Sequence, residues 1–153
     1  MGYDIFVAAL RCPHCERTTP ADVSTNMQTK LRDDPDLSSL GVGDALSIDH
    51  ATAVESGYLA VQRPADPVHI GHIWACPSCH HDPNWAEIVV RDGRIESIEA
   101  VPLDRATLER LHYLEEDAWY FIADRAGLKF EDLARNEVVP TLRRFLAESR
   151  ELA

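Results

Sequence analysis

The 153 residues are enough for one domain of average size, and no apolar run reaches the length of a membrane-spanning helix. The chain has 15 Lys and Arg against 26 Asp and Glu, a formal net charge of −11. Phosphate binding depends on clustered basic residues, and the only lysines are Lys30 and Lys129, so this charge disfavours DNA and RNA as partners. The acidity fits a solvated surface or a face that contacts a basic protein partner.

Strand-like patterns fill the chain as far as residue 101. Within them, 25–31 alternates strictly between the two faces of a strand. Asp92-Gly93 is typical of a two-residue type I′ turn and predicts a hairpin, in which the spacing of Ile95 and Ile98 indicates a bulge. The candidate strands, in chain order, are 3–10, 25–31, 45–48, 58–62, 68–75, 85–91 and 94–101.

The pattern becomes helical after residue 103. Apolar residues recur at helical spacing over 104–126, where Asp104 or Thr107 can cap the start. A short turn over 130–135 and a last helix beginning near Pro140 follow. We therefore expect an α+β fold within one domain of 1–153: a mostly antiparallel β region over 1–102, then a helical part over 103–153 with two helices.

All four cysteines lie in two Cys-Pro-x-Cys turns, 12–15 and 76–79. Two cysteines three residues apart in a tight turn can direct both sulfurs at one point, and two such turns supply four thiolates for a tetrahedral metal. We predict one structural Zn²⁺ bound by Cys12, Cys15, Cys76 and Cys79. Because a long structured segment separates the turns, the metal would join the ends of two non-adjacent strands and close the β region like a clasp.

Three other uses of these motifs fit less well. A DsbA-type thiol oxidase needs its first cysteine at a helix N-terminus, and 16–20 is a poor helix start. The run 76–80 matches the Cys-x-x-Cys-His motif of covalent haem attachment, which normally follows export, and the N-terminus lacks a cationic signal-peptide start. Zinc deaminases use a Pro-Cys-x-x-Cys motif, with proline directly before the first cysteine. Arg11 and Ala75 occupy that position in this chain. Paired cysteines without a signal peptide favour a reducing cytoplasm.

The two turns, each at the end of a strand-like run, resemble the knuckles of the zinc-ribbon superfamily. The resemblance covers the turns and their flanking strands, and it implies that the four cysteines are metal ligands. Zinc-ribbon knuckles usually have glycine directly after the second cysteine, because the backbone there has a positive φ. Glu16 and His80 hold those places in this chain. The superfamily is too broad to imply a function.

A catalytic site would need residues other than these thiolates, because a closed four-cysteine site is a poor Lewis acid. His69 and His72 lie on opposite faces of the expected strand. Asp49-His50 with Glu55 offers acid and base groups, but no nucleophile accompanies it. The seven histidines considered are His14, His50, His69, His72, His80, His81 and His112, of which His14, His80 and His81 lie near the cysteine turns.

The sequence favours a non-catalytic zinc-binding protein that acts as a protein-interaction module, either an adaptor or an inhibitor of immunity type with a basic partner. The alternatives are an enzyme with a histidine-rich site near the turns, and a transcription- or translation-associated zinc ribbon that works through protein contacts. Among the apolar residues of 119–121, core packing is the favoured role, although part of that cluster can contact a partner. The candidate acidic faces are Asp33, Asp34 and Asp36, and Glu115, Glu116 and Asp117.

Overall fold

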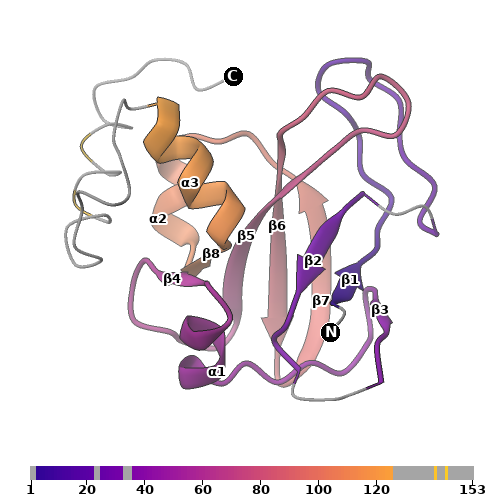
Figure 1. The fold of residues 1–153 in the computed structure, drawn as a ribbon. Helices are drawn as coiled ribbons and strands as arrows, with labels where there is room; N and C mark the ends of the chain where they lie inside the picture. The colour runs from indigo at the N-terminus through magenta and orange to yellow at the C-terminus, as the bar shows by residue number, and fades with distance from the viewer. Residues whose placement is uncertain (1–2, 23–24, 33–35, 126–139, 141–143, 145–153) are drawn as a thin grey trace.

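The computed structural model describes residues 3–22, 25–32, 36–125, 140 and 144 (Figure 1). The fold is α+β with mostly antiparallel sheets, as predicted. Among the described residues, no helix has the length and apolar character needed to cross a bilayer. The elements are β1 (Asp4–Phe6), β2 (Met27–Thr29), β3 (Ser39–Leu40), α1 (His50–Glu55), β4 (Leu59–Ala60), β5 (Val68–Trp74), β6 (Asn84–Arg91), β7 (Arg94–Ala100), α2 (Arg105–Arg110), β8 (Tyr113–Leu114) and α3 (Glu116–Arg125).

The strands form two sheets. The smaller has the order β2-β1-β3, with β1 antiparallel to β2 and parallel to β3. The larger has the order β4-β8-β5-β6-β7, in which the β5–β8 pair is parallel and the others are antiparallel. Figure 1 shows α2 and α3 on one side of β5 and β6, and the smaller sheet on the other side.

Strand β5 separates two apolar cores. Successive side chains of a strand point to opposite faces, so β5 contributes to both sides of the larger sheet. Ile70 and Trp74 belong to the core shared with Phe6 and Met27 of the smaller sheet, whereas Ile73 packs against the core formed with α2 and α3. Strand β5 is therefore covered on both faces, whereas β7 at the edge of the same sheet keeps one face exposed.

The β6–β7 hairpin confirms the prediction for this segment. Asp92 and Gly93 have φ angles of 51° and 73°, as a type I′ turn requires. The register shifts opposite Val89 and Val90, between the partners Ile95 and Ser97. This bulge lies between Ile95 and Ile98, and it lets both isoleucines point into the core, where they are buried.

The single helix predicted over 104–126 is wrong in its middle. Asp104 caps α2 as predicted, since its carboxylate accepts the Thr107 N–H at 2.8 Å. However, the backbone becomes extended at Leu111, and β8 then pairs with both β4 and β5 before α3 begins. Pairing with the larger sheet thus overrides the local helical spacing. Of the last predicted helix, only Pro140 and Arg144 are described, and both are helical; the short turn predicted over 130–135 lies outside the described residues.

The N-terminal strands are shorter than predicted, and one helix was not predicted at all. Strand 3–10 is reduced to β1 and strand 25–31 to β2. The candidate strand 45–48 is reduced to an isolated bridge between Ala45 and Arg94. Helix α1 follows this segment, because Asp49 accepts the Thr52 N–H and caps its first turn.

Candidate metal centre

The structure brings the four cysteines together at one point. Their sulfurs all lie within 4.8 Å of one another, and the Sγ–Sγ distances are 3.7 Å for Cys12–Cys79 and 3.7 Å for Cys15–Cys76. A tetrahedron with zinc–sulfur distances of about 2.3 Å has edges of about 3.8 Å, whereas a disulfide needs about 2.05 Å. The cluster therefore has the dimensions of a tetrahedral four-thiolate site that can hold a metal ion.

Both cysteine loops have the same backbone hydrogen bonds. In each, the N–H of the first cysteine donates to the carbonyl five residues later, and its own carbonyl accepts the N–H four residues later. The pairs are Cys12 N to Arg17 O and Glu16 N to Cys12 O in the first loop, and Cys76 N to His81 O and His80 N to Cys76 O in the second, at 2.9 to 3.1 Å.

The residue after each second cysteine has the backbone conformation that usually calls for glycine. Glu16 has a φ of 65° and His80 a φ of 63°. A left-handed conformation costs a residue with a β-carbon about 1–2 kcal/mol, so both loops hold a non-glycine residue against its preference. The positive φ after the second cysteine is therefore present in both loops without glycine.

The loops come from different sheets. Cys12 follows the chain that leaves β1 of the smaller sheet, and Cys76 follows the end of β5 in the larger sheet. Cys12 and Cys76 are buried, while Cys15 and Cys79 are half-buried. Backbone N–H groups, that of Cys79 first, lower the pKa of the Cys76 thiol and favour its thiolate. For the Cys79 thiol, the backbone N–H of His81 also acts to lower the pKa, but burial and the neighbouring thiols outweigh it, so that pKa is raised.

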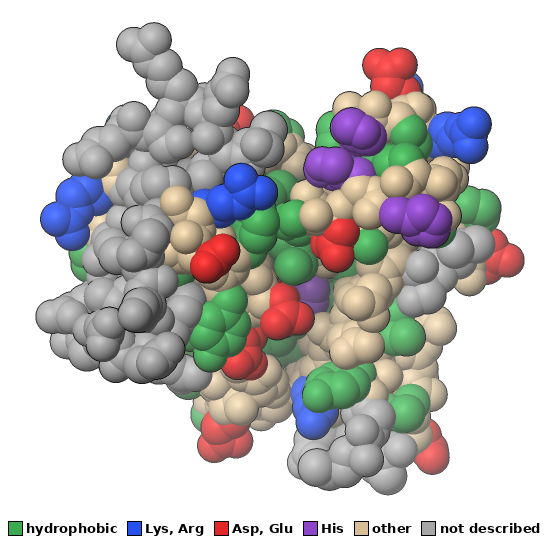
Figure 2. Space-filling model, turned by 45° about the horizontal axis from the view of Figure 1, so that its top comes forward, with side chains coloured by type: hydrophobic (Ala, Val, Ile, Leu, Met, Phe, Trp, Pro, Cys, Tyr) green, Lys and Arg blue, Asp and Glu red, His purple; other side chains and the backbone are tan. Residues whose placement is uncertain are grey.

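Two polar groups approach the sulfur of Cys12. Cys12 Sγ accepts the His14 N–H at 3.4 Å and faces the amide of buried Asn84 at 4.0 Å. Asn84 also bonds the His81 ring at 2.7 Å, and the His81 ring stacks on His14 with centroids 4.7 Å apart. Such contacts orient thiolates and moderate their charge. Histidine side chains gather on these loops at the upper right of Figure 2.

Two of the three predicted histidine neighbours contact each other between the two cysteine loops. His14 and His81 stack there, whereas His80 is exposed and sets the turn of the second loop. Asn84 was missed by sequence reasoning. Its place directly after the second loop, before a strongly apolar strand, is the signal that could have identified it.

The acid–base candidate at Asp49 and His50 is not assembled. The Asp49 carboxylate accepts the Thr52 N–H at 3.0 Å and the Thr52 hydroxyl at 2.9 Å, and these bonds lower its pKa. The His50 ring instead bonds the Tyr113 hydroxyl at 2.8 Å, and Glu55 lies at the far end of α1. Asp49 therefore caps a helix rather than serving as a base.

His72 is a core residue. It faces the smaller sheet, and its Nε2 lies 2.6 Å from the Tyr58 hydroxyl, which in turn lies 2.7 Å from the Thr29 hydroxyl. Burial lowers the pKa of His72 to about 3, so the ring is neutral at physiological pH. The bonds satisfy three buried polar groups and link β2 to β5.

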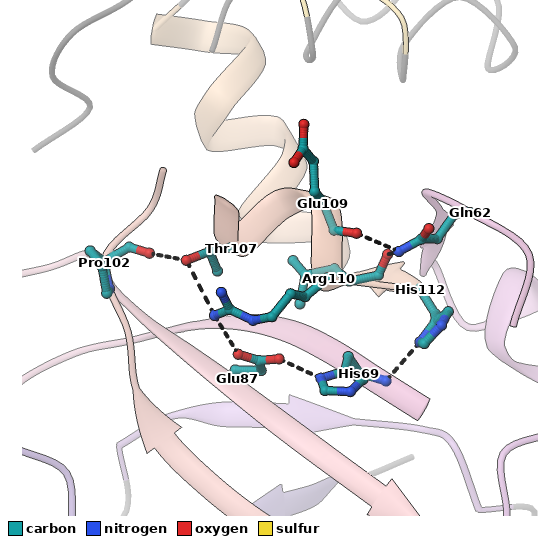
Figure 3. Close-up of polar contacts among 9 residues, drawn as sticks. Gln62, His69, Glu87, Pro102, Thr107, Glu109, Arg110 and His112 are labelled. Atoms are coloured by element: carbon teal, nitrogen blue, oxygen red, sulfur yellow. Dashed lines mark hydrogen bonds and ion pairs between the residues drawn. The ribbon is translucent and has the colours of Figure 1, made fainter. Parts of the chain in front are cut away.

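His69 faces the opposite side of the sheet, as strand alternation predicts, and belongs to a second polar cluster (Figure 3). Glu87 is nearly buried, and its two oxygens contact the His69 ring at 2.5 Å and the Arg110 guanidinium at 2.9 Å. Burial opposes ionisation of Glu87, but bonds from Arg110 and His69 outweigh it and lower its pKa. His112 accepts the His69 backbone N–H at its Nδ1, at 2.9 Å. When neutral, His112 therefore carries its proton on Nε2.

The cluster around Glu87 was missed by sequence reasoning because it joins residues from β5, β6, α2 and the start of β8. The signal available in the sequence was Glu87, a charged residue at an inward-facing position of the mostly apolar strand β6. The sequence does not show which residues contact Glu87 or at what distance, because these contacts depend on the pairing of β5 with β6 and β8.

No protein-family model matches the chain, and no curated protein or solved structure matches it.

Proposed function

We propose that this chain is a non-catalytic zinc-binding protein in which one structural Zn²⁺ ties the two sheets together, and that it acts as a protein-interaction module. The ligands in this proposal are Cys12, Cys15, Cys76 and Cys79. The observation that carries the proposal is the cluster of four sulfurs within 4.8 Å of one another, held by two loops with matching hydrogen bonds.

The donor set favours zinc. Soft thiolates in a tetrahedral arrangement select zinc or iron among the common metals. Zinc in a four-cysteine site has no open position, so its role is structural. Because the loops extend from different sheets, the metal would link two layers that otherwise meet through side-chain packing and hydrogen bonds such as those of Tyr58 with Thr29 and His72. Metal binding of this kind supplies on the order of 10 kcal/mol to folding.

A protein partner is the second part of the proposal, with an adaptor or an inhibitor as the possible roles. The net charge of −11 supports a basic partner, because opposite charges accelerate encounter. The acidic cluster on α3 supports it less than its sequence suggests. Glu115 is half-buried and burial raises its pKa to about 7, which leaves Asp117 as the exposed member. Asp33 and Asp34 lie outside the described residues.

One observation favours an enzyme as the second candidate. Glu87 orients the His69 ring, and a carboxylate–imidazole pair of this kind can transfer protons. However, neither the cavity beside the cysteine loops nor the one lined by Ser47 and Gly93 has His69 or Glu87 in its lining. The cluster also fastens β6 to α2 through Arg110, so a structural role accounts for it.

Elemental analysis of the purified protein tests the metal. The expected result is about one zinc per chain, lost in Cys76→Ser and retained in the matched control Ser78→Ala, which changes the same loop without removing a ligand. Finding stoichiometric iron, with its visible absorption, would show that the bound metal is iron and not zinc. A metal-free protein with two local disulfides, shown by the absence of titratable thiols, would overturn the proposal.

A further inference from the structure

A groove of about 690 Å³ lies beside the metal centre. One wall comes from both cysteine loops, through Arg11, Pro13 and 81–84. The other comes from the connection between β7 and α2 and from α3, through Phe121 and Arg125. Figure 2 shows a hollow with hydrophobic side chains between the histidine-bearing loops and the helical part. Residues that fix the metal thus also shape this groove.

The floor of the groove is aromatic and held in place. The rings of Trp85 and Phe121 lie 5.8 Å apart at 60°, and both side chains are half-buried. The Trp85 carbonyl accepts the Trp74 indole N–H at 3.1 Å and the Val101 N–H at 2.9 Å, which anchors the backbone of Trp85. A partner would meet a preorganised apolar surface here, which lowers the entropic cost of binding.

The charge of the groove is opposite to that of the whole chain. Among the residues that the structure describes, its lining contains two arginines, one aspartate, and neither lysine nor glutamate, in a chain of net charge −11. Arg11 pairs with Glu16 at 3.7 Å, but their side chains are 66% and 76% exposed, so this pair is weak. The Arg125 guanidinium lies 4.9 Å from the centre of the Phe121 ring. Both arginines are therefore placed to meet a carboxylate beside the apolar floor.

We propose that this groove binds an extended segment of a partner protein in which apolar side chains stand next to acidic ones. The apolar side chains lie on Trp85 and Phe121, and the carboxylates meet Arg11 and Arg125. Aromatic residues and arginine, with few lysines and glutamates, are the composition of protein–protein interface cores. Net charge acts on encounter at long range, whereas the groups in contact select the segment that docks. The proposal rests on the proposed function, because the metal loops form one wall.

Selection from a random displayed peptide library on the immobilised, zinc-loaded protein identifies the probe. We expect enriched peptides to combine aromatic, proline or aliphatic residues with Asp or Glu. The synthetic peptide is then titrated by fluorescence polarisation against variants. Arg125→Glu, and the double variant with Arg11→Glu, should weaken binding by about tenfold or more, as should Phe121→Ala. The matched control is Arg91→Glu, since Arg91 pairs with Glu96 at 3.1 Å at the far end of β6 and should bind like the wild type.

Three results would overturn the groove: no enrichment over a blank surface, enrichment of peptides without acidic residues, or equal binding by wild type and Arg125→Glu. Zinc content is measured on every sample, which separates this proposal from the proposed function. If the protein is zinc-loaded but binds no selected peptide, only the proposal that the groove binds a partner segment is refuted. A metal-free protein that binds the acidic peptides refutes the zinc proposal alone.

Discussion

Glu115 is the residue whose replacement should stabilise the protein most visibly. Its carboxylate lies directly before α3, accepts the Asp117 N–H at 3.0 Å, and is half-buried beside Asp117 and Glu116. Burial raises its pKa from 4.5 to about 7, and the neighbouring acids add to this effect. Glu115→Gln keeps an oxygen acceptor for the Asp117 N–H and removes the ionisation, so the variant should be more stable than the wild type.

The size of the gain follows from linkage. A carboxyl group with a higher pKa in the folded state binds its proton more tightly there, so stability falls as pH rises from the unfolded pKa through the folded one. With pKa values of 4.5 unfolded and about 7 folded, the cost grows from about 2 kcal/mol near pH 6 to about 3 kcal/mol near pH 8. Screening by solvent at the exposed part of the side chain makes these values upper limits.

Urea denaturation of the zinc-loaded protein, followed by tryptophan fluorescence at several pH values from pH 6 to pH 8, measures this gain. Glu99→Gln, an exposed carboxylate on β7, is the control and should change stability little at any pH. A gain for Glu115→Gln that stays constant across this pH range would refute the reasoning, because only a raised pKa makes the difference grow. A loss of stability would show that the charged carboxylate stabilises the start of α3 by more than its burial destabilises the fold.

Three further predictions concern the metal, the Glu87 cluster and the packing of β5. Cys76→Ser should melt far below His81→Ala in thermal denaturation, because only the first removes a ligand whose metal contributes on the order of 10 kcal/mol to folding; equal melting temperatures would refute a structural metal. Glu87→Gln should lower stability by about 2 kcal/mol at neutral pH. The pKa of Glu87 is lowered in the folded state, so the stability difference between wild type and Glu87→Gln is present above the unfolded pKa of 4.5. It disappears as the pH falls through the pKa of Glu87 in the folded state. Denaturation at several pH values with excess zinc measures this difference. Gly71→Ala should cost about 1–3 kcal/mol in urea denaturation, since an added Cβ would stand 2.7 Å from Leu111 Cδ1; an unchanged midpoint would show that Leu111 moves freely.

The features predicted correctly from sequence depend on residues close together in the chain. Asp92-Gly93 predicts its turn because the turn is made by the backbone freedom of those two residues. Asp104 predicts the start of α2 because a cap reaches only three residues along. The cysteine turns belong to the same class, and since no cysteine is left over, their meeting at one point could also be anticipated.

Tertiary contacts decided the remaining features. Residues 113–114 have helical spacing on both sides, yet they form β8, because an open position between β4 and β5 offers more hydrogen bonds and burial than one further helical turn. The contacts of Glu87 with His69 and Arg110, and the groove between the cysteine loops and α3, likewise follow from the register of β5 with β6 and the position of the helices. By itself the sequence determined the α+β class, the turn at Asp92-Gly93, the cap of α2 and the set of four thiols, since each is encoded in local chemistry. Only the tertiary structure decided which distant side chains meet, because those distances are set by strand pairing and core packing over the whole chain.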